Sequence, residues 1–302
     1  MLGIIGLGRM GMGLTNRLLK SNKKVVVYNR SHQKTDLVAK KGAIPSYDFE
    51  QFFAELDKSN SRRIIWVMLP DDVLPNILPE LEVYLMKGDI LIDGGNSNFN
   101  DSKLRYDYFF EKGISFLDIG VSGGLFGEEK GYCMMVGGDK SSYDELISYF
   151  DVLCKKDGFG YMGSPGSGHF VKMVHNSIEY GMMQSFAEGF NLLRNGPFNS
   201  LDIKNISDVW SNGSIISSFL LDMASKGFND FGVDLREVGS SVDDNGEGRW
   251  AVKTAIDSGV PFTANSFAVF QRFTSKGNDE FANQFLSALR KEFGGHSFER
   301  KS

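Results

Sequence analysis

The chain has 302 residues, of which 41% are hydrophobic and 24% are charged. This composition is typical of a soluble globular protein with room for two domains, and it excludes disordered, collagen-like and coiled-coil chains. The formal net charge of -5 argues against a broad basic surface for nucleic acid or anionic membranes. Two cysteines, Cys133 and Cys154, are too few for a disulfide framework, and no apolar run reaches membrane-spanning length. With no signal-peptide pattern either, we expect a cytoplasmic protein.

Short β-branched segments alternate with helical patterns through the first half of the chain. The predicted strands cover residues 2–5, 24–28, 64–68, 89–93, 115–119 and 132–136, and a helix is predicted over 140–153. Such alternation indicates a parallel sheet that is buried on both faces. In sheets of this kind ligands bind in the crevice outside the carboxyl ends of the strands, so we expect the chemistry there.

The pattern changes after the turn-forming residues 163–168. No strand is predicted beyond them, and residues 169–194 contain neither proline nor a cluster of turn formers, which favours one long helix. Shorter helices are predicted over residues 214–224, 250–258, 266–273 and 279–293. The second half of the chain is therefore expected to be all-helical.

The first predicted strand runs directly into the segment Gly6-Leu7-Gly8-Arg9-Met10-Gly11. G-x-G-x-x-G in this position is typical of a dinucleotide-binding loop, because Gly6 permits a tight turn, Gly8 a close approach to a pyrophosphate and Gly11 close helix packing. A glycine turn without a ligand is the alternative. We expect an α/β Rossmann-type dinucleotide-binding domain over residues 1–165, followed by an all-α domain over residues 166–302.

The residues after the second strand bear on the choice of cofactor. NAD-binding chains usually carry an acidic residue here for the ribose hydroxyl, whereas this chain has Asn29, Arg30 and Ser31. The guanidinium of Arg30 suits a 2′-phosphate, so the sequence favours NADP as the cofactor. NAD stays open, since cofactor preference is a difference of two affinities that one residue need not settle.

Two polar glycine turns, residues 93–97 and 120–124, close the fourth and fifth predicted strands of the parallel pattern. Such turns present backbone N–H groups and short side chains to an anionic or hydroxylated ligand. Asn96 and Ser122 are therefore candidate ligand contacts. Either turn taken alone is also compatible with ordinary loop geometry.

The long predicted helix carries Lys172, His175, Asn176 and Glu179 at spacings of three, four and seven, which places them on one face. If this face is buried, it brings an amine and a carboxyl group together for proton transfer. If it is exposed, it is an ordinary solvated surface. No metal site is expected, because the four histidines are scattered and no paired-cysteine motif exists.

Several of these segments together resemble the 6-phosphogluconate dehydrogenase family. The resemblance is carried by H-F-V-K-M-V-H-N-x-I-E-Y-G at residues 169–181, with D-G-G-N-S at 93–97 and G-V-S-G-G at 120–124, and it continues at 246–250, 270–273 and 290–296. In length the chain is similar to the short form of the family. The resemblance implies oxidative decarboxylation of 6-phosphogluconate in the pentose phosphate pathway, with NADP as cofactor, by a homodimer or homotetramer.

The resemblance also implies roles for individual residues. Lys172 would take the proton from the carbon-3 hydroxyl, and Glu179 would protonate carbon 1 of the enediol. The cofactor would contact Gly6, Leu7, Gly8, Arg9, Met10, Gly11, Asn29, Arg30, Ser31 and Asn96. The substrate would contact Asn96, Ser122, Gly123, Gly124, His175, Asn176, Tyr180, Arg249, Arg272, Arg290 and His296. Ser177 departs from the family's usual glycine, and Ser217 stands where arginine is frequent.

Two other readings of the sequence stay open. A β-hydroxyacid dehydrogenase of the 3-hydroxyisobutyrate type would share the glycine loop and the lysine, but it has no evident need for Glu179 or for three arginines around a phosphate. A non-catalytic NADP-binding protein would be expected to have lost Lys172 or Glu179, and both residues are present.

Overall fold

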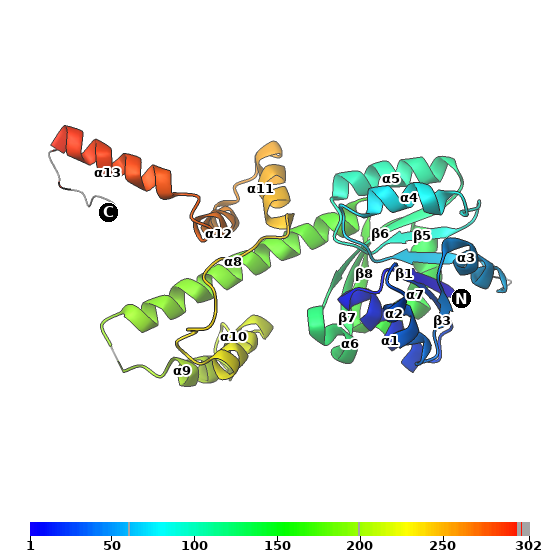
Figure 1. Ribbon diagram of the computed structural model, residues 1–302, viewed down its shortest axis with the longest axis horizontal. Coiled ribbons are helices and arrows are strands. Elements are labelled where there is room, and N and C mark those ends of the chain that lie inside the picture. Colours follow the sequence, from blue (N-terminus) through cyan, green and yellow to red (C-terminus); the bar gives the residue numbers. More distant parts are fainter. Residues whose placement is uncertain (60, 199, 295–296, 298–302) are drawn as a thin grey trace. The chain divides into compact units, whose positions relative to one another are not determined.

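The computed structural model describes residues 1–59, 61–198, 200–294 and 297. Its contacts divide the chain into two compact units, Met1–Met173 and Val174–Ser302. The first unit contains a sheet with helices on both faces, and the described part of the second unit contains helices only (Figure 1). The expected α/β domain followed by an all-α domain is thereby confirmed.

The sheet of the first unit has eight strands in the order β3-β2-β1-β4-β5-β6-β7-β8. The strands are β1 (Leu2–Ile5), β2 (Val25–Tyr28), β3 (Ile44–Ser46), β4 (Ile64–Val67), β5 (Ile90–Asp93), β6 (Ser115–Ser122), β7 (Tyr132–Gly138) and β8 (Cys154–Gly163). All neighbours pair in parallel except β6 and β7. The strand order reverses between β1 and β4, which places a ligand crevice at the carboxyl end of β1.

Helices bury both faces of this sheet. The helices of the first unit are α1 (Arg9–Lys20), α2 (His32–Ala39), α3 (Phe49–Asp57), α4 (Leu74–Glu82), α5 (Phe99–Glu111), α6 (Gly127–Lys130) and α7 (Lys140–Leu153), with the 3-10 turn η1 (Gly124–Phe126). One apolar cluster joins α1, α2 and α7 to the sheet, and a second joins α3, α4 and α5 to its other face. Strands buried on both faces explain why the predicted strands are continuous apolar runs.

The long helix α8 (Ser167–Asn195) begins in the first unit and continues into the second. It is followed by α9 (Ile203–Ser211), α10 (Phe219–Phe231), α11 (Glu247–Asp257), α12 (Thr263–Thr274) and α13 (Glu280–Gly294). Two small apolar clusters hold α8 to four of these helices: one around Phe190 and Leu221 joins it to α9 and α10, and the other around Tyr180 and Val269 joins it to α11 and α12. The predicted domain boundary after residue 165 stays a prediction.

The structure differs from the predicted elements in several places. Strands β3 and β8 and helix α9 were not predicted, and the helix predicted over 214–224 begins only at Phe219. That start is set by Ser218, whose hydroxyl accepts a hydrogen bond from the Leu221 N–H at 3.3 Å and so caps the helix. Strand β8 is an edge strand whose lysines and glycines lack the apolar pattern of a buried strand.

Candidate functional site

The glycine loop leaves β1 with a conformation that its glycines require. Gly6 has a φ of +99°, and a Cβ on it would lie 2.6 Å from the carbonyl oxygen of Met68. A Cβ on Gly11 would overlap the carbonyl oxygen of Gly6. A Cβ on Gly8, by contrast, would meet no atom within 4 Å. The loop is therefore closed toward the sheet and open at Gly8, where α1 begins and its first N–H groups can receive a pyrophosphate.

Three residues after β2 were predicted to contact the cofactor. The Oδ1 atom of Asn29 accepts a hydrogen bond from the backbone N–H of Leu7 at 2.8 Å, and its Nδ2 atom donates to the carbonyl of Ser31 at 3.1 Å. The carboxamide of Asn29 thus braces the glycine loop from the neighbouring strand. Arg30 and Ser31 are exposed beside it. Of the three, Arg30 carries the charge that could meet a phosphate.

The two polar turns lie at the same edge of the sheet as the glycine loop, because they follow β5 and β6. The buried carboxylate of Asp93 shapes the first turn: it accepts from the N–H of Gly95 at 3.1 Å and pairs with Arg105 at 2.9 Å. Gly123 and Gly124 in the second turn have positive φ angles of 134° and 50°, which glycine adopts without strain. Asn96 and Ser122 are half-buried in these turns.

The start of α8 is fixed to β6 by a buried carboxylate. Asp118 is fully buried, and its two oxygens accept hydrogen bonds from the N–H groups of Gly166 at 2.8 Å and His169 at 2.9 Å. Burial raises the pKa of the Asp118 carboxyl, while the nearby His169 and the two backbone donors act in the opposite direction. The His169 ring adds a second contact, because its Nδ1 atom lies 2.7 Å from the hydroxyl oxygen of Ser102 on α5.

Lys172 lies one turn beyond this anchor. A Cβ on Gly120, two residues after Asp118 on β6, would overlap the Cβ of Lys172, so the lysine occupies space that only glycine leaves open. Cys133 on β7 faces Ser122 in the antiparallel register. Burial raises the pKa of the Cys133 thiol, and the positive charge of Lys172 lowers it. The ammonium group of Lys172 therefore acts at the end of β6 where Ser122 lies.

In the second unit a row of polar contacts joins α8 to the start of α11. The Nδ1 atom of His175 lies 3.0 Å from Oδ1 of Asn176, and Nδ2 of Asn176 donates to Oε1 of Glu247 at 2.7 Å. Glu247 is only 3% exposed. Glu179, one turn further along α8, is half-buried, as are Lys172, His175 and Asn176. Lys172, His175, Asn176 and Glu179 form the polar stripe of α8. This stripe is thus neither fully buried nor an ordinary solvated face.

Two of the predicted arginines lie near Tyr180 and the segment before α11. The guanidinium of Arg272 lies 3.5 Å from the centre of the Tyr180 ring and donates to the carbonyl of Asp243 at 2.6 Å. The Tyr180 hydroxyl accepts from the N–H of Asn245 at 3.2 Å. Arg249 pairs with Asp244 at 2.9 Å. The second unit therefore presents two cations on one short stretch of its surface.

The third predicted arginine, Arg290, is not brought to this place. Within the described ranges Arg290 is exposed on α13 and makes no hydrogen bond or ion pair with Tyr180, Arg249 or Arg272. His296 lies outside the described residues. Two residues of the site were not predicted, Asp118 and Glu247, because their partners are distant in the sequence and no local motif marks them.

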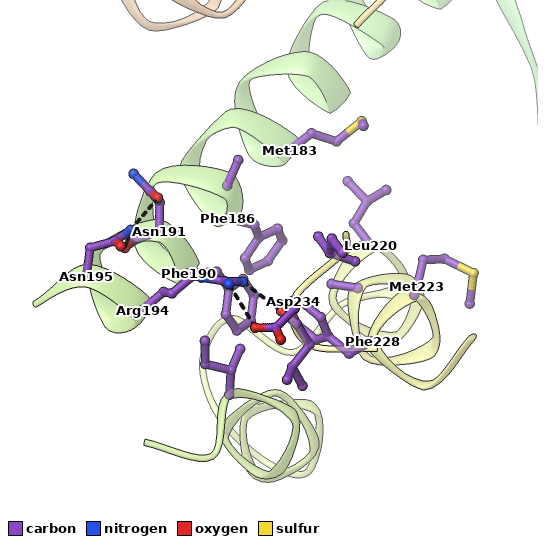
Figure 2. Close-up of a pocket in the computed structure, with 16 residues that line it drawn as sticks. Met183, Phe186, Phe190, Asn191, Arg194, Asn195, Leu220, Met223, Phe228 and Asp234 are labelled. Atoms are coloured by element: carbon purple, nitrogen blue, oxygen red, sulfur yellow. Dashed lines mark hydrogen bonds and ion pairs between the residues drawn. The ribbon is translucent and has the colours of Figure 1, made fainter. Parts of the chain in front are cut away.

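A large apolar groove lies elsewhere in the second unit. Figure 2 shows Phe186 and Phe190 of α8 facing Leu220, Met223 and Phe228 of α10. The cavity that these residues line has a volume of about 710 Å³. An ion pair between Arg194 and Asp234, 2.8 Å apart, borders it. None of the predicted site residues lines this groove, so it is separate from the candidate site.

The described residues hold neither a metal-binding cluster nor a membrane-spanning helix. No described group of three or more His, Cys, Asp or Glu side chains is arranged to hold a metal ion. Among the helices in the described ranges, none has the length and apolar character needed to cross a membrane.

Comparison with known proteins gives a match over nearly the whole chain. Residues 1–163 match the family described as the NAD binding domain of 6-phosphogluconate dehydrogenase, and residues 168–301 match its C-terminal domain. The chain is 37% identical over 302 residues to the NAD(+)-dependent, decarboxylating 6-phosphogluconate dehydrogenase of Haloferax volcanii, covering 99% of both chains.

Solved structures share the fold at lower sequence identity. A 6-phosphogluconate dehydrogenase from Plasmodium falciparum, studied in apo form and with NADP+ or 6-phosphogluconate, superposes with a TM-score of 0.83 at 24% identity over 99% of this chain and 66% of that one. A 3-hydroxyisobutyrate dehydrogenase from Mycobacterium tuberculosis gives a TM-score of 0.71 at 18% identity over 92% and 93%. These likenesses establish the fold, and the sequence matches establish the family.

Proposed function

The chain belongs to the 6-phosphogluconate dehydrogenase family, and from this premise we propose that it converts 6-phosphogluconate to ribulose 5-phosphate and carbon dioxide with reduction of NADP. The observation that carries the proposal is the stripe of α8, where Lys172 stands over Gly120 and Glu179 follows two turns later, both half-buried. This arrangement supplies an amine and a carboxyl group on one helix for two separate proton transfers.

The cofactor site in this proposal is the loop of residues 6–11. The open space at Gly8 and the first N–H groups of α1 would receive the pyrophosphate, and the Asn29 carboxamide keeps the loop in shape through Leu7. The bound nicotinamide supplies the hydride acceptor for carbon 3 of the sugar acid. Arg30 would pair with the 2′-phosphate of NADP, which is the reason for preferring NADP over NAD.

In the oxidation step Lys172 accepts the proton of the carbon-3 hydroxyl while the hydride leaves carbon 3. The 3-keto acid that results loses carbon dioxide when the bond between carbons 1 and 2 breaks, and its electron pair passes to the ketone oxygen. The protonated Lys172 stabilises that oxygen and returns a proton to it. Glu179 then donates a proton to carbon 1 of the five-carbon enediol while the neutral Lys172 takes back the proton of the carbon-2 hydroxyl, which gives the ketone of ribulose 5-phosphate.

The substrate carries a carboxylate and a phosphate, and each needs a partner. Arg249 and Arg272 would bind the phosphate, with Arg290 and His296 as further predicted contacts. Ser122, Gly123, Gly124 and Asn96 would bind the carboxylate and hydroxyl groups through the two turns. This need for cations explains why an acidic chain concentrates arginines near Tyr180.

The Arg30→Ala variant tests the cofactor assignment. Because a charged hydrogen bond to phosphate would be lost, we expect the KM for NADP to rise by about 10- to 100-fold, with the KM for NAD little changed. Steady-state kinetics with each cofactor measure this. A parallel rise for both cofactors, or a wild-type protein that prefers NAD, would overturn the NADP assignment and leave the reaction intact.

The Glu179→Gln variant tests the reaction itself. A carboxamide cannot donate the proton to carbon 1 in the same way, so we expect turnover of 6-phosphogluconate to fall by about 10²- to 10⁴-fold. Glu188→Gln, at an exposed position of the same helix, is the matched control and should keep the wild-type rate. A wild-type rate in Glu179→Gln, or faster oxidation of 3-hydroxyisobutyrate than of 6-phosphogluconate by the unmodified protein, would contradict the proposal.

A further inference from the structure

A relay of three polar side chains crosses from α8 to the first residue of α11. His175 Nδ1 lies 3.0 Å from Asn176 Oδ1, and Asn176 Nδ2 donates to Glu247 Oε1 at 2.7 Å. Glu247 is 3% exposed, so its end of the relay is shielded from water. Within residues 246–250, the sequence predicts a role only for Arg249. The reaction proposed above assigns no role to Glu247.

The direction of each hydrogen bond follows from the chemistry of the groups. An ionised carboxyl group only accepts, so it forces the amide nitrogen of Asn176 toward Glu247. The amide oxygen then faces His175, and because this oxygen also only accepts, Nδ1 of the ring must carry a hydrogen. A neutral imidazole has one ring proton, which leaves Nε2 unprotonated and able to accept a hydrogen bond.

We propose that Glu247 is a positioning residue that fixes the tautomer of His175, so that His175 meets the substrate through Nε2 as a hydrogen-bond acceptor. The group it would take is a hydroxyl of the polyhydroxylated sugar acid, which donates to Nε2. This inference rests on the proposed function for the identity of the ligand. The tautomer itself is a property of the protein alone, and it can be measured without any substrate.

The opposite orientation of the Asn176 amide is unfavourable. If Asn176 turned its oxygen to an ionised Glu247, two acceptors would lie 2.7 Å apart in a site shielded from water. A glutamine at position 247 removes this constraint, since its amide can donate or accept. Glu247→Gln therefore keeps the size of the side chain and removes only the enforced direction of the relay.

The first measurement is the tautomer of His175 in the unmodified protein. The chain has four histidines, so selective ¹⁵N labelling gives a simple spectrum, and His175→Gln identifies the resonances of this ring. At about pH 8, where an ordinary histidine is neutral, we expect the hydrogen on Nδ1. A ring protonated on Nε2 would overturn the proposal, whether or not 6-phosphogluconate proves to be the substrate.

The second measurement compares Glu247→Gln with Glu188→Gln. Glu188 also accepts a hydrogen bond from a carboxamide on α8, Gln184 at 2.8 Å, but it is exposed. We expect mixed His175 tautomers and about a tenfold higher KM for 6-phosphogluconate in Glu247→Gln, with kcat changed less, and neither effect in Glu188→Gln. An unchanged tautomer and KM in a folded Glu247→Gln protein would contradict the role of Glu247. A fall in kcat with an unchanged KM in Glu247→Gln would also contradict this role.

Discussion

At the scale of single residues, the position of Lys172 depends on the absence of a side chain at Gly120. Gly120 offers no Cβ, so the lysine side chain starts directly over β6. Its charge reaches Cys133 on β7, where it lowers the pKa of the thiol against the raising effect of burial. The thiol of Cys133 therefore reports the presence of the lysine's charge independently of any reaction.

Lys172→Met is expected to change two properties together. Without the cation the pKa of Cys133 rises, so at a fixed pH below that pKa less thiolate is present and alkylation by iodoacetamide becomes severalfold slower. Turnover should fall by about 10²- to 10⁴-fold. Mass spectrometry of the labelled protein gives the alkylation rate, with the exposed Lys20→Met as control.

Cys154 provides an internal reference in the same experiment. Burial raises the pKa of its thiol to about 12, so it should stay unlabelled while the protein is folded. If Cys133 reacts at the same rate with and without Lys172, the lysine does not lie where the structure places it.

At the scale of secondary-structure elements, the start of α8 depends on Asp118. Its carboxylate holds the N–H groups of Gly166 and His169, and the helix then carries Lys172 one turn later. These N–H groups belong to a helix start and have no partner within the helix itself. Asp118 thus connects the buried sheet to the proposed catalytic stripe.

Asp118→Ala removes the acceptor of both N–H groups. We expect the free energy of unfolding to fall by about 2 to 4 kcal/mol, because two hydrogen bonds to a charged group are lost, partly offset by relief of its burial. Urea unfolding followed by circular dichroism measures this change. Asp144→Ala, which breaks an exposed i,i+4 pair with Lys140, should cost only about 0.3 to 0.5 kcal/mol. Equal losses in the two variants would disprove the anchoring role.

The elements that the sequence predicts are those with a local signal. The glycine loop, the buried strands and the long helix each show within a few neighbouring residues. Strand β8 does not, since an edge strand tolerates lysine and glycine in place of an apolar run. Asp118 and Glu247 escape prediction for a different reason: their partners lie 51 and 71 residues away, and only the folded chain brings them together.

At the scale of the whole molecule, the fold alone does not select the reaction. The same fold serves a 6-phosphogluconate dehydrogenase and a 3-hydroxyisobutyrate dehydrogenase among the solved structures. In the function proposed above, the choice depends on side chains that the fold carries, above all Glu179, Arg249 and Arg272. The proposed function therefore requires that oxidation by this chain is coupled to loss of carbon dioxide.

The most direct test is to count both products in one reaction. Purified protein is given 6-phosphogluconate with NADP, and in parallel with NAD, while reduced dinucleotide and released carbon dioxide are measured together. We predict equal amounts of the two products and a faster reaction with NADP. Dinucleotide reduction without carbon dioxide release, or no reaction with 6-phosphogluconate and either cofactor, would contradict the account.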